Sequence, residues 1–336
     1  MARWTATVVV SVIALAACSG SSTAAPTTNH TKPSSATTHA TATTTAPTHV
    51  VVAAAPFQLS RPSARAALVA DGDHLLLLGG FDGAKQTIGD IMRIDPASRS
   101  TRPAGRLPTA VHDAAGALVA GRPMVFGGGN STETAGVQAV NSDGTVVLAG
   151  SLPIPRSDLA TATVGTRTFI VGGYDGSRVR ATTVATSDGS HFDVLGDLPV
   201  PVRYPAVAAL GSLVYAVGGT TNGNTSGAVT AVQVLDTATG AVRKIGDIPQ
   251  PLTDAVAATV RGHIYIFGGQ LAGRISDQVW RLDVDPAGAT PVTLTPVATL
   301  PSPVTDAAIA VWHDVAYLVG GESPSILPTI TTLEVR

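Results

Sequence analysis

Polar side chains that could do chemistry recur at one position of the chain, at intervals of 45 to 52 residues. These residues are Arg65, Asp113, Asp158, Tyr204, Asp254 and Asp306. Carboxylates that meet in a confined place repel one another, and each raises the pKa of the others unless a cation or a hydrogen-bond donor compensates. If the six side chains converge, they can supply acid–base pairs and bind hydroxyl or amine groups of a ligand.

A sequence repeat positions these residues. Each lies six residues after a Leu or Ile, and that apolar residue lies 20 residues before a Gly-Gly pair that closes a short apolar run. The pairs begin at Gly79, Gly127, Gly172, Gly218, Gly268 and Gly320, and the apolar residues are Leu59, Leu107, Leu152, Leu198, Ile248 and Leu300. A period near 50 residues with strand-like content is typical of propeller blades. We therefore expect an all-β, six-bladed β-propeller over residues 56–336.

Each repeat is expected to form four short strands. In blade 3 they are residues 159–164, 168–171, 181–186 and 192–195. The last blade stops after its third strand, 329–336, whereas Phe57–Leu59 resembles only the last strand of a blade. We expect Phe57–Leu59 to close the ring by pairing outside strand 329–336, because this pairing removes exposed sheet edges.

In such a propeller the six polar positions fall at the start of the inner strands, around one mouth of the central channel. Ring order places Arg65 between Asp306 and Asp113 and opposite Tyr204. His112 adjoins Asp113 and is the only histidine placed to help with proton transfer there; otherwise it is a solvated loop residue. The alternative for the aspartates is that each accepts backbone N–H groups in its own loop and points away from the axis.

The remaining composition excludes several kinds of partner. Only 13% of the 336 residues are charged and the formal net charge is −2, so no basic surface for nucleic acid is expected. His74, His263 and His313 fall in separate blades near the opposite face, so we expect no metal site. No cofactor is expected, and the protein is predicted to be a monomer.

The repeat resembles the kelch motif, which shares an apolar strand that ends in Gly-Gly and a following Leu-Pro-x-Pro-Arg segment. Blade 3 fits best, with Leu152-Pro153-Ile154-Pro155-Arg156 and Gly172-Gly173-Tyr174-Asp175-Gly176. At the position of the kelch tyrosine this chain instead has Ile94, Leu235 and Leu282. The resemblance implies kelch-type four-stranded blades, because aliphatic side chains can fill the same space between blades.

The only cysteine of the chain indicates where the protein is located. Residues 1–17 contain Arg3 and an apolar run too short to span a bilayer, as in a signal peptide. Leu15-Ala16-Ala17-Cys18 resembles the lipobox of bacterial lipoproteins, which implies cleavage before Cys18 and a lipid anchor on it. The alternative is an ordinary secretory signal. Residues 18–55, rich in Thr, Ala and Ser, are predicted to be a disordered tether.

Two functions remain open. The first is a cell-envelope lipoprotein that presents the propeller as a protein- or glycan-binding module. The second is a carbohydrate-active enzyme, because the architecture is similar to that of sialic-acid mutarotases, and the ring of Asp, Arg and Tyr would then supply acid–base groups. A copper-radical site like that of galactose oxidase needs a Tyr-Cys crosslink, which the chain cannot form if Cys18 carries the lipid.

Overall fold

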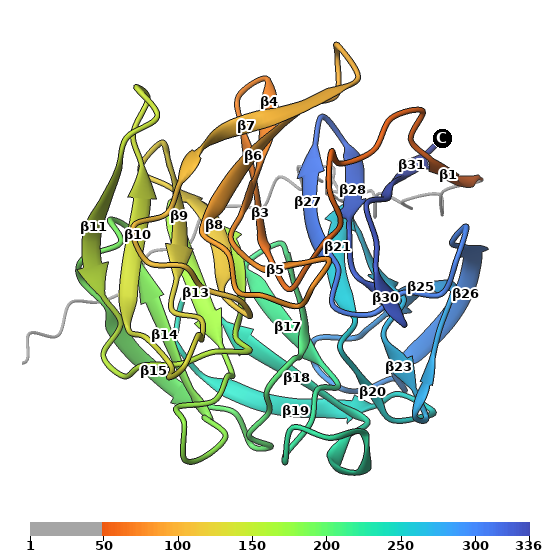
Figure 1. Ribbon diagram of the computed structural model, residues 1–336. Helices are drawn as coiled ribbons and strands as arrows, with labels where there is room; N and C mark the ends of the chain where they lie inside the picture. Colours follow the sequence, from red (N-terminus) through yellow and green to blue (C-terminus); the bar gives the residue numbers. More distant parts are fainter. Residues whose placement is uncertain (1–48) are drawn as a thin grey trace, which may run out of the picture. The chain divides into compact units, whose positions relative to one another are not determined.

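The computed structural model describes residues 49–336, so Cys18, the expected signal peptide and most of the expected tether lie outside the described residues. The described part is almost entirely β-structure: six four-stranded antiparallel sheets are arranged around a central axis (Figure 1). One 3-10 helix, η1 (Thr225–Gly227), interrupts a loop. Within this part of the chain, no helix has the length and apolar character needed to cross a bilayer. The expected six-bladed propeller is confirmed.

The strands of each blade follow one another from the channel outward. Blade 1 consists of β3 (Ala67–Asp71), β4 (His74–Leu78), β6 (Asp90–Asp95) and β7 (Ser100–Arg106). Blade 2 consists of β8 (Ala115–Val119), β9 (Arg122–Phe126), β10 (Gly136–Val140) and β11 (Val146–Ser151). Blade 3 consists of β12 (Ala160–Val164), β13 (Arg167–Val171), β14 (Thr182–Thr186) and β15 (Asp193–Asp197).

The second half of the ring repeats this order. Blade 4 consists of β16 (Ala206–Leu210), β17 (Leu213–Val217), β18 (Ala231–Asp236) and β19 (Val242–Asp247). Blade 5 consists of β21 (Val256–Val260), β22 (His263–Phe267), β25 (Gln278–Asp283) and β26 (Thr293–Thr299). Blade 6 consists of β27 (Ala308–Trp312), β28 (Val315–Val319), β31 (Ile330–Val335) and β1 (Val50–Ala54).

The ring closes through β1, which comes from the start of the described chain and pairs antiparallel with β31 (Figure 1). Closure by an N-terminal strand was expected, but the predicted strand Phe57–Leu59 was wrong, because those residues form no strand. The propeller therefore begins at Val50, inside the segment 18–55 that we expected to be a tether.

Side-chain chemistry explains the position of the closing strand. Val50, Val51 and Val52 are consecutive β-branched residues, which favour the extended conformation. Val50 and Val52 pack against the apolar cluster between blades 5 and 6. Leu59 is already used elsewhere, because it is buried in the cluster between blades 6 and 1. The valine run was predicted to be part of the tether because the surrounding segment is rich in Thr, Ala and Ser.

The core is divided into six apolar clusters, one between each pair of neighbouring blades. Each contains one of the repeat residues Leu59, Leu107, Leu152, Leu198, Ile248 and Leu300. The inner strands β3, β8, β12, β16, β21 and β27 also contact one another in a closed cycle. The repeat therefore encodes contacts between blades, and these contacts hold the inner strands around the channel.

The glycine pairs allow neighbouring blades to approach closely. At Gly172, φ is +68°, and a Cβ atom there would lie 2.5 Å from the carbonyl oxygen of Val202 in the next blade. Gly173 donates its N–H to that same carbonyl oxygen at 2.9 Å. Any side chain at Gly172 would thus push the two blades apart.

Candidate functional site at the channel mouth

The six polar repeat residues share a strained backbone conformation. Arg65, Asp113, Asp158, Tyr204, Asp254 and Asp306, here called the ring residues, have φ angles of +55°, +52°, +56°, +54°, +57° and +54°. This left-handed region is unfavourable for residues other than glycine, and such strain often accompanies functional sites. The backbone N–H of Asp113 donates to the carbonyl of Arg65 at 2.9 Å, and Asp158 donates to Asp113 at 2.8 Å, so equivalent residues of adjacent blades are linked.

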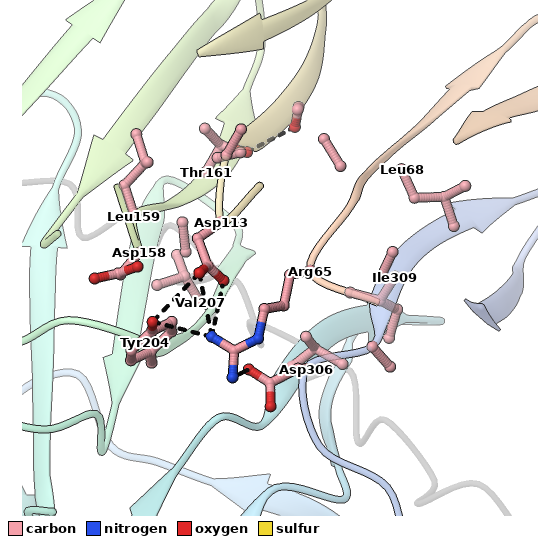
Figure 2. Close-up of a pocket in the computed structure, with 18 of the residues that line it drawn as sticks. Arg65, Leu68, Asp113, Asp158, Leu159, Thr161, Tyr204, Val207, Asp306 and Ile309 are labelled. Carbon is pink, nitrogen blue, oxygen red and sulfur yellow. Dashed lines mark hydrogen bonds and ion pairs between the residues drawn. The ribbon is translucent and has the colours of Figure 1, made fainter. Parts of the chain in front are cut away.

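All six ring residues line one cavity of about 200 Å³ at the mouth of the channel. Figure 2 labels all of them except Asp254. Asp113 and Asp306 point toward Arg65 at the mouth, whereas Asp158 directs its Oδ2 toward Arg203. The contrast with nearby loop aspartates is clear: Asp82 accepts the backbone N–H groups of Ala84 and Gln86, and Asp175 caps its own turn in the same way. Among residues 49–336, no backbone N–H donates to a ring carboxylate with comparable geometry.

Arg65 extends across the mouth and contacts three other blades. Its Nη1 lies 3.1 Å from Asp113 Oδ2 and donates to Tyr204 Oη at 3.1 Å, and its Nη2 lies 3.3 Å from Asp306 Oδ1 (Figure 2). Its Nε donates to Glu322 Oε1 at 2.9 Å. The guanidinium is therefore surrounded by acceptors, and its position is fixed by blades on both sides of the channel.

Four further polar residues contact the ring residues directly or, in the case of Lys85, through Glu322, and the sequence analysis missed them. They are Lys85, Arg203, Gln270 and Glu322. The repeat contains a sequence signal that could have identified Arg203, Gln270 and Glu322. The residue before each ring residue pairs with the residue after the Gly-Gly pair, as in Arg203 with Thr220, Thr253 with Gln270 and Thr305 with Glu322. Lys85 lies on a loop outside the repeat, so no such signal could have found it.

Asp158 and Asp254 do not contact Arg65. Asp158 forms an ion pair with Arg203, whose guanidinium also stacks on the ring of Tyr174 at 4.3 Å. Asp158 is 3% exposed, and the oxygen that contacts Arg203 Nη2 is its Oδ2. Asp254 accepts a hydrogen bond of 3.0 Å from Gln270 Nε2 and takes part in no salt bridge with the described residues.

Burial makes these carboxyl groups weaker acids than usual. It raises the pKa of Asp306 to about 8, that of Asp158 to about 7 and that of Asp254 to about 6. Arg65 opposes the shift at Asp306 and Asp254, and Arg203 opposes it at Asp158, whereas Asp113 raises all three pKa values. The mouth therefore holds groups that can accept or release protons near neutral pH.

Burial, followed by Asp113 and Asp158, raises the pKa of Tyr204 far above its usual range, so its hydroxyl stays protonated. Burial opposes the charge of Arg65, but Asp113 and Asp306 outweigh this effect and raise its pKa. Arg65 is therefore a permanent cation, and Tyr204 is a permanent hydroxyl donor.

His112 lies behind Asp113 and does not line the cavity. Its ring stacks on Phe81 with a centroid distance of 4.2 Å, its Nδ1 lies 2.8 Å from Thr87 Oγ1, and its Nε2 lies 3.8 Å from Asp113 Oδ2. Burial lowers the pKa of His112, with a further contribution from Arg65. It is thus a packed, neutral neighbour of Asp113 rather than a solvated loop residue.

The cavity continues into the channel between the inner strands, where a section of about 430 Å³ is lined by Ala, Val, Leu, Ile, Gly and Thr. The hydroxyl groups of its three threonines have partners: Thr161 donates to Gly116 O at 2.7 Å, Thr163 pairs with Thr168, and Thr259 donates to Ala209 O. No charged side chain lines this section, so the ionisable groups of the channel are confined to the mouth.

Nowhere in residues 49–336 do three or more His, Cys, Asp or Glu side chains meet in an arrangement suited to a metal ion. Arg65 instead occupies the centre of the carboxylates, where it supplies the positive charge.

Fold and repeat together define a kelch-type six-bladed β-propeller. The family model of the Kelch motif matches residues 251–285, which lie in blade 5 and not in blade 3, where we expected the best fit. The chain is similar in fold to the solved structure of YjhT, a kelch-repeat propeller, with a TM-score of 0.67 and 14% identity over 82% of this chain and 95% of that one. No curated protein sequence gives a significant match.

Proposed function

We propose that the protein is a lipid-anchored module of the cell envelope that binds a sugar residue of a glycan at the channel mouth. The observation that carries this proposal is the convergence of four aspartates, Arg65 and Tyr204 in one open cavity. Sugar hydroxyls both donate and accept hydrogen bonds, and this set offers acceptors and donors close together. The lipid anchor on Cys18 and the extracytoplasmic location rest on the lipobox-like segment alone.

The size of the site favours a single sugar ring over an extended polymer. A cavity of about 200 Å³ is smaller than the roughly 300–1,000 Å³ of pockets for drug-sized ligands. A terminal residue of a glycan can enter such a cavity while the rest of the chain stays outside. A flat protein surface would not reach the buried carboxylates, and the glycan is therefore the preferred ligand.

Titration calorimetry of the full-length protein with a panel of monosaccharides tests this function. We expect millimolar or tighter binding of at least one sugar, and at least tenfold weaker binding by Asp113→Asn and Tyr204→Phe. Arg106→Ala is the control, because Arg106 lies on the outer strand β7, where its side chain is exposed. Absence of binding by every sugar, or equal binding by all variants, would argue against the proposal.

A second candidate is catalysis of sugar mutarotation or epimerisation, favoured by the raised pKa values of Asp158 and Asp306. A carboxyl group with a pKa near 7 can both donate and accept a proton at neutral pH, as acid–base catalysis requires. Exchange between sugar anomers can be followed by magnetisation-transfer NMR. An exchange rate that rises with protein concentration and falls in Asp158→Asn would support catalysis. An exchange rate that the protein does not change would contradict catalysis and leave sugar binding as the remaining function.

A further inference from the structure

Carboxylates outnumber cations at the mouth. The carboxylates are Asp113, Asp158, Asp254, Asp306 and Glu322, and the cations are Arg65, Lys85 and Arg203. Every one of the three cations is in contact with at least one carboxylate. An anionic group of a ligand would therefore compete with these carboxylates for the cations of the described site.

The charges are distributed unevenly around the ring. Arg65 of blade 1 neutralises the arc formed by blades 6, 1 and 2, where it contacts Asp306 and Asp113. The opposite arc, in blades 3, 4 and 5, consists of Asp158, Tyr204 and Asp254. We call this second set the open arc. Arg65 reaches it through Tyr204, whose hydroxyl accepts a hydrogen bond from Nη1 and whose ring lies 5.6 Å from the guanidinium carbon.

The two aspartates at the ends of the open arc differ in their partners. Asp158 is already paired, because Arg203 contacts its Oδ2 from outside the cavity. Asp254 is half-buried, forms no salt bridge with the described residues and accepts a hydrogen bond from the neutral amide of Gln270, although its pKa of about 6 leaves it mostly ionised at neutral pH. A partly desolvated carboxylate without a cation is costly, and a ligand that supplies the positive charge is bound correspondingly well.

We propose that the sugar bound at the mouth carries a protonated amine and that Asp254 binds this ammonium group. This inference rests on the proposed function and names the class of its ligand. Amino sugars are preferred to neutral sugars because the ammonium compensates the charge of Asp254 and donates several hydrogen bonds. Sugars with a carboxylate are disfavoured because they meet the ionised Asp254, while the described cations of the mouth are already paired with carboxylates.

The test compares glucosamine, glucose and glucuronate, which share a pyranose ring and differ in charge. Their affinities for the full-length protein are measured by titration calorimetry just below neutral pH, where the amine is protonated. We expect glucosamine to bind at least tenfold more tightly than glucose, with an affinity that falls as salt is added, and glucuronate to bind least. Asp254→Asn should remove the preference for glucosamine over glucose.

Asp193→Asn is the matched control, because Asp193 lies on the outer strand β15 and is exposed. Circular dichroism of each variant establishes that it is folded. Equal affinity for glucosamine and glucose, or tighter binding of glucuronate, would overturn the inference and leave glycan binding itself intact. Absence of binding by every sugar of the wider monosaccharide panel would instead contradict the proposed function.

Discussion

Arg65 of blade 1 and Tyr204 of blade 4, on opposite sides of the propeller, are joined by a hydrogen bond of 3.1 Å across the channel mouth. The arginine also contacts Asp113 and Asp306, so a single side chain connects blades that share no strand pairing. We conclude that Arg65 has a structural role at the mouth in addition to its charge.

Loss of Arg65 should therefore destabilise the propeller. Arg65→Ala leaves carboxylates that are buried without their cation, and such losses typically cost about 3–5 kcal/mol. Thermal and urea unfolding should show a loss of this order. Methylguanidinium at millimolar concentration should restore part of the melting temperature, because it can occupy the vacated space.

The control for this rescue is Arg61→Ala, which removes a more exposed ion pair with Asp90. Surface pairs contribute only about 0–1 kcal/mol, so we expect a small loss and no rescue. Equal losses in the two variants, or rescue of both, would show that Arg65 is not held as a buried cation.

Asp254→Asn should stabilise the protein at neutral and alkaline pH. The pKa of Asp254 is about 6 in the folded protein against an ordinary value of 3.8. Its favourable contribution is therefore present below about pH 4 and is lost as the pH rises through 6. The Asn variant avoids this loss, so its unfolding free energy should match the wild type in acid and exceed it by about 1–3 kcal/mol above pH 7.

Asp158→Asn provides the comparison for Asp254→Asn. The pKa of Asp158 is also raised, to about 7, but this substitution leaves Arg203 without its carboxylate. The gain in unfolding free energy above pH 7 should then be smaller than for Asp254→Asn, or it should become a loss. Parallel stability–pH profiles for wild type and Asp254→Asn would mean that Asp254 does not titrate in this range.

Truncation at the N-terminus should locate the closing strand. Deletion of residues 19–48 retains β1, so the melting temperature should change little. Deletion of residues 19–55 removes β1, exposes the edge of β31 and uncovers the cluster between blades 5 and 6. We expect a decrease of several degrees in differential scanning calorimetry. Equal melting temperatures would place the stabilising contact elsewhere.

Cys18→Ala should release the protein from the membrane fraction, because the proposed lipid is attached to that residue. Detergent-phase partitioning and metabolic labelling with a fatty-acid analogue measure this directly. A variant that still partitions into the detergent phase would contradict the lipoprotein assignment, with wild type as the positive control.

The repeat determined most of the fold. Leu107 and its equivalents recur because each fills the space between two blades, and Gly172 and its equivalents recur because the next blade approaches too closely for a Cβ atom. These are local requirements met once per blade, so they leave a periodic signal. The same period brought the six ring residues to one mouth of the channel, since identical positions in a cyclic repeat lie on one ring.

The partners of the ring residues could be found only in the tertiary structure. Arg65 lies 257 residues from Glu322 and 139 from Tyr204 in the sequence, and no periodicity predicts which side chain reaches across the channel. The charge imbalance of the open arc depends on these contacts, because Arg203 pairs with Asp158, whereas Asp254 accepts a hydrogen bond from the neutral Gln270. The closing strand was misplaced for a related reason: Val50–Ala54 is stabilised by pairing with β31 at the far end of the chain. Strand pairing and ion pairing depend on distances in space, which a single sequence does not contain.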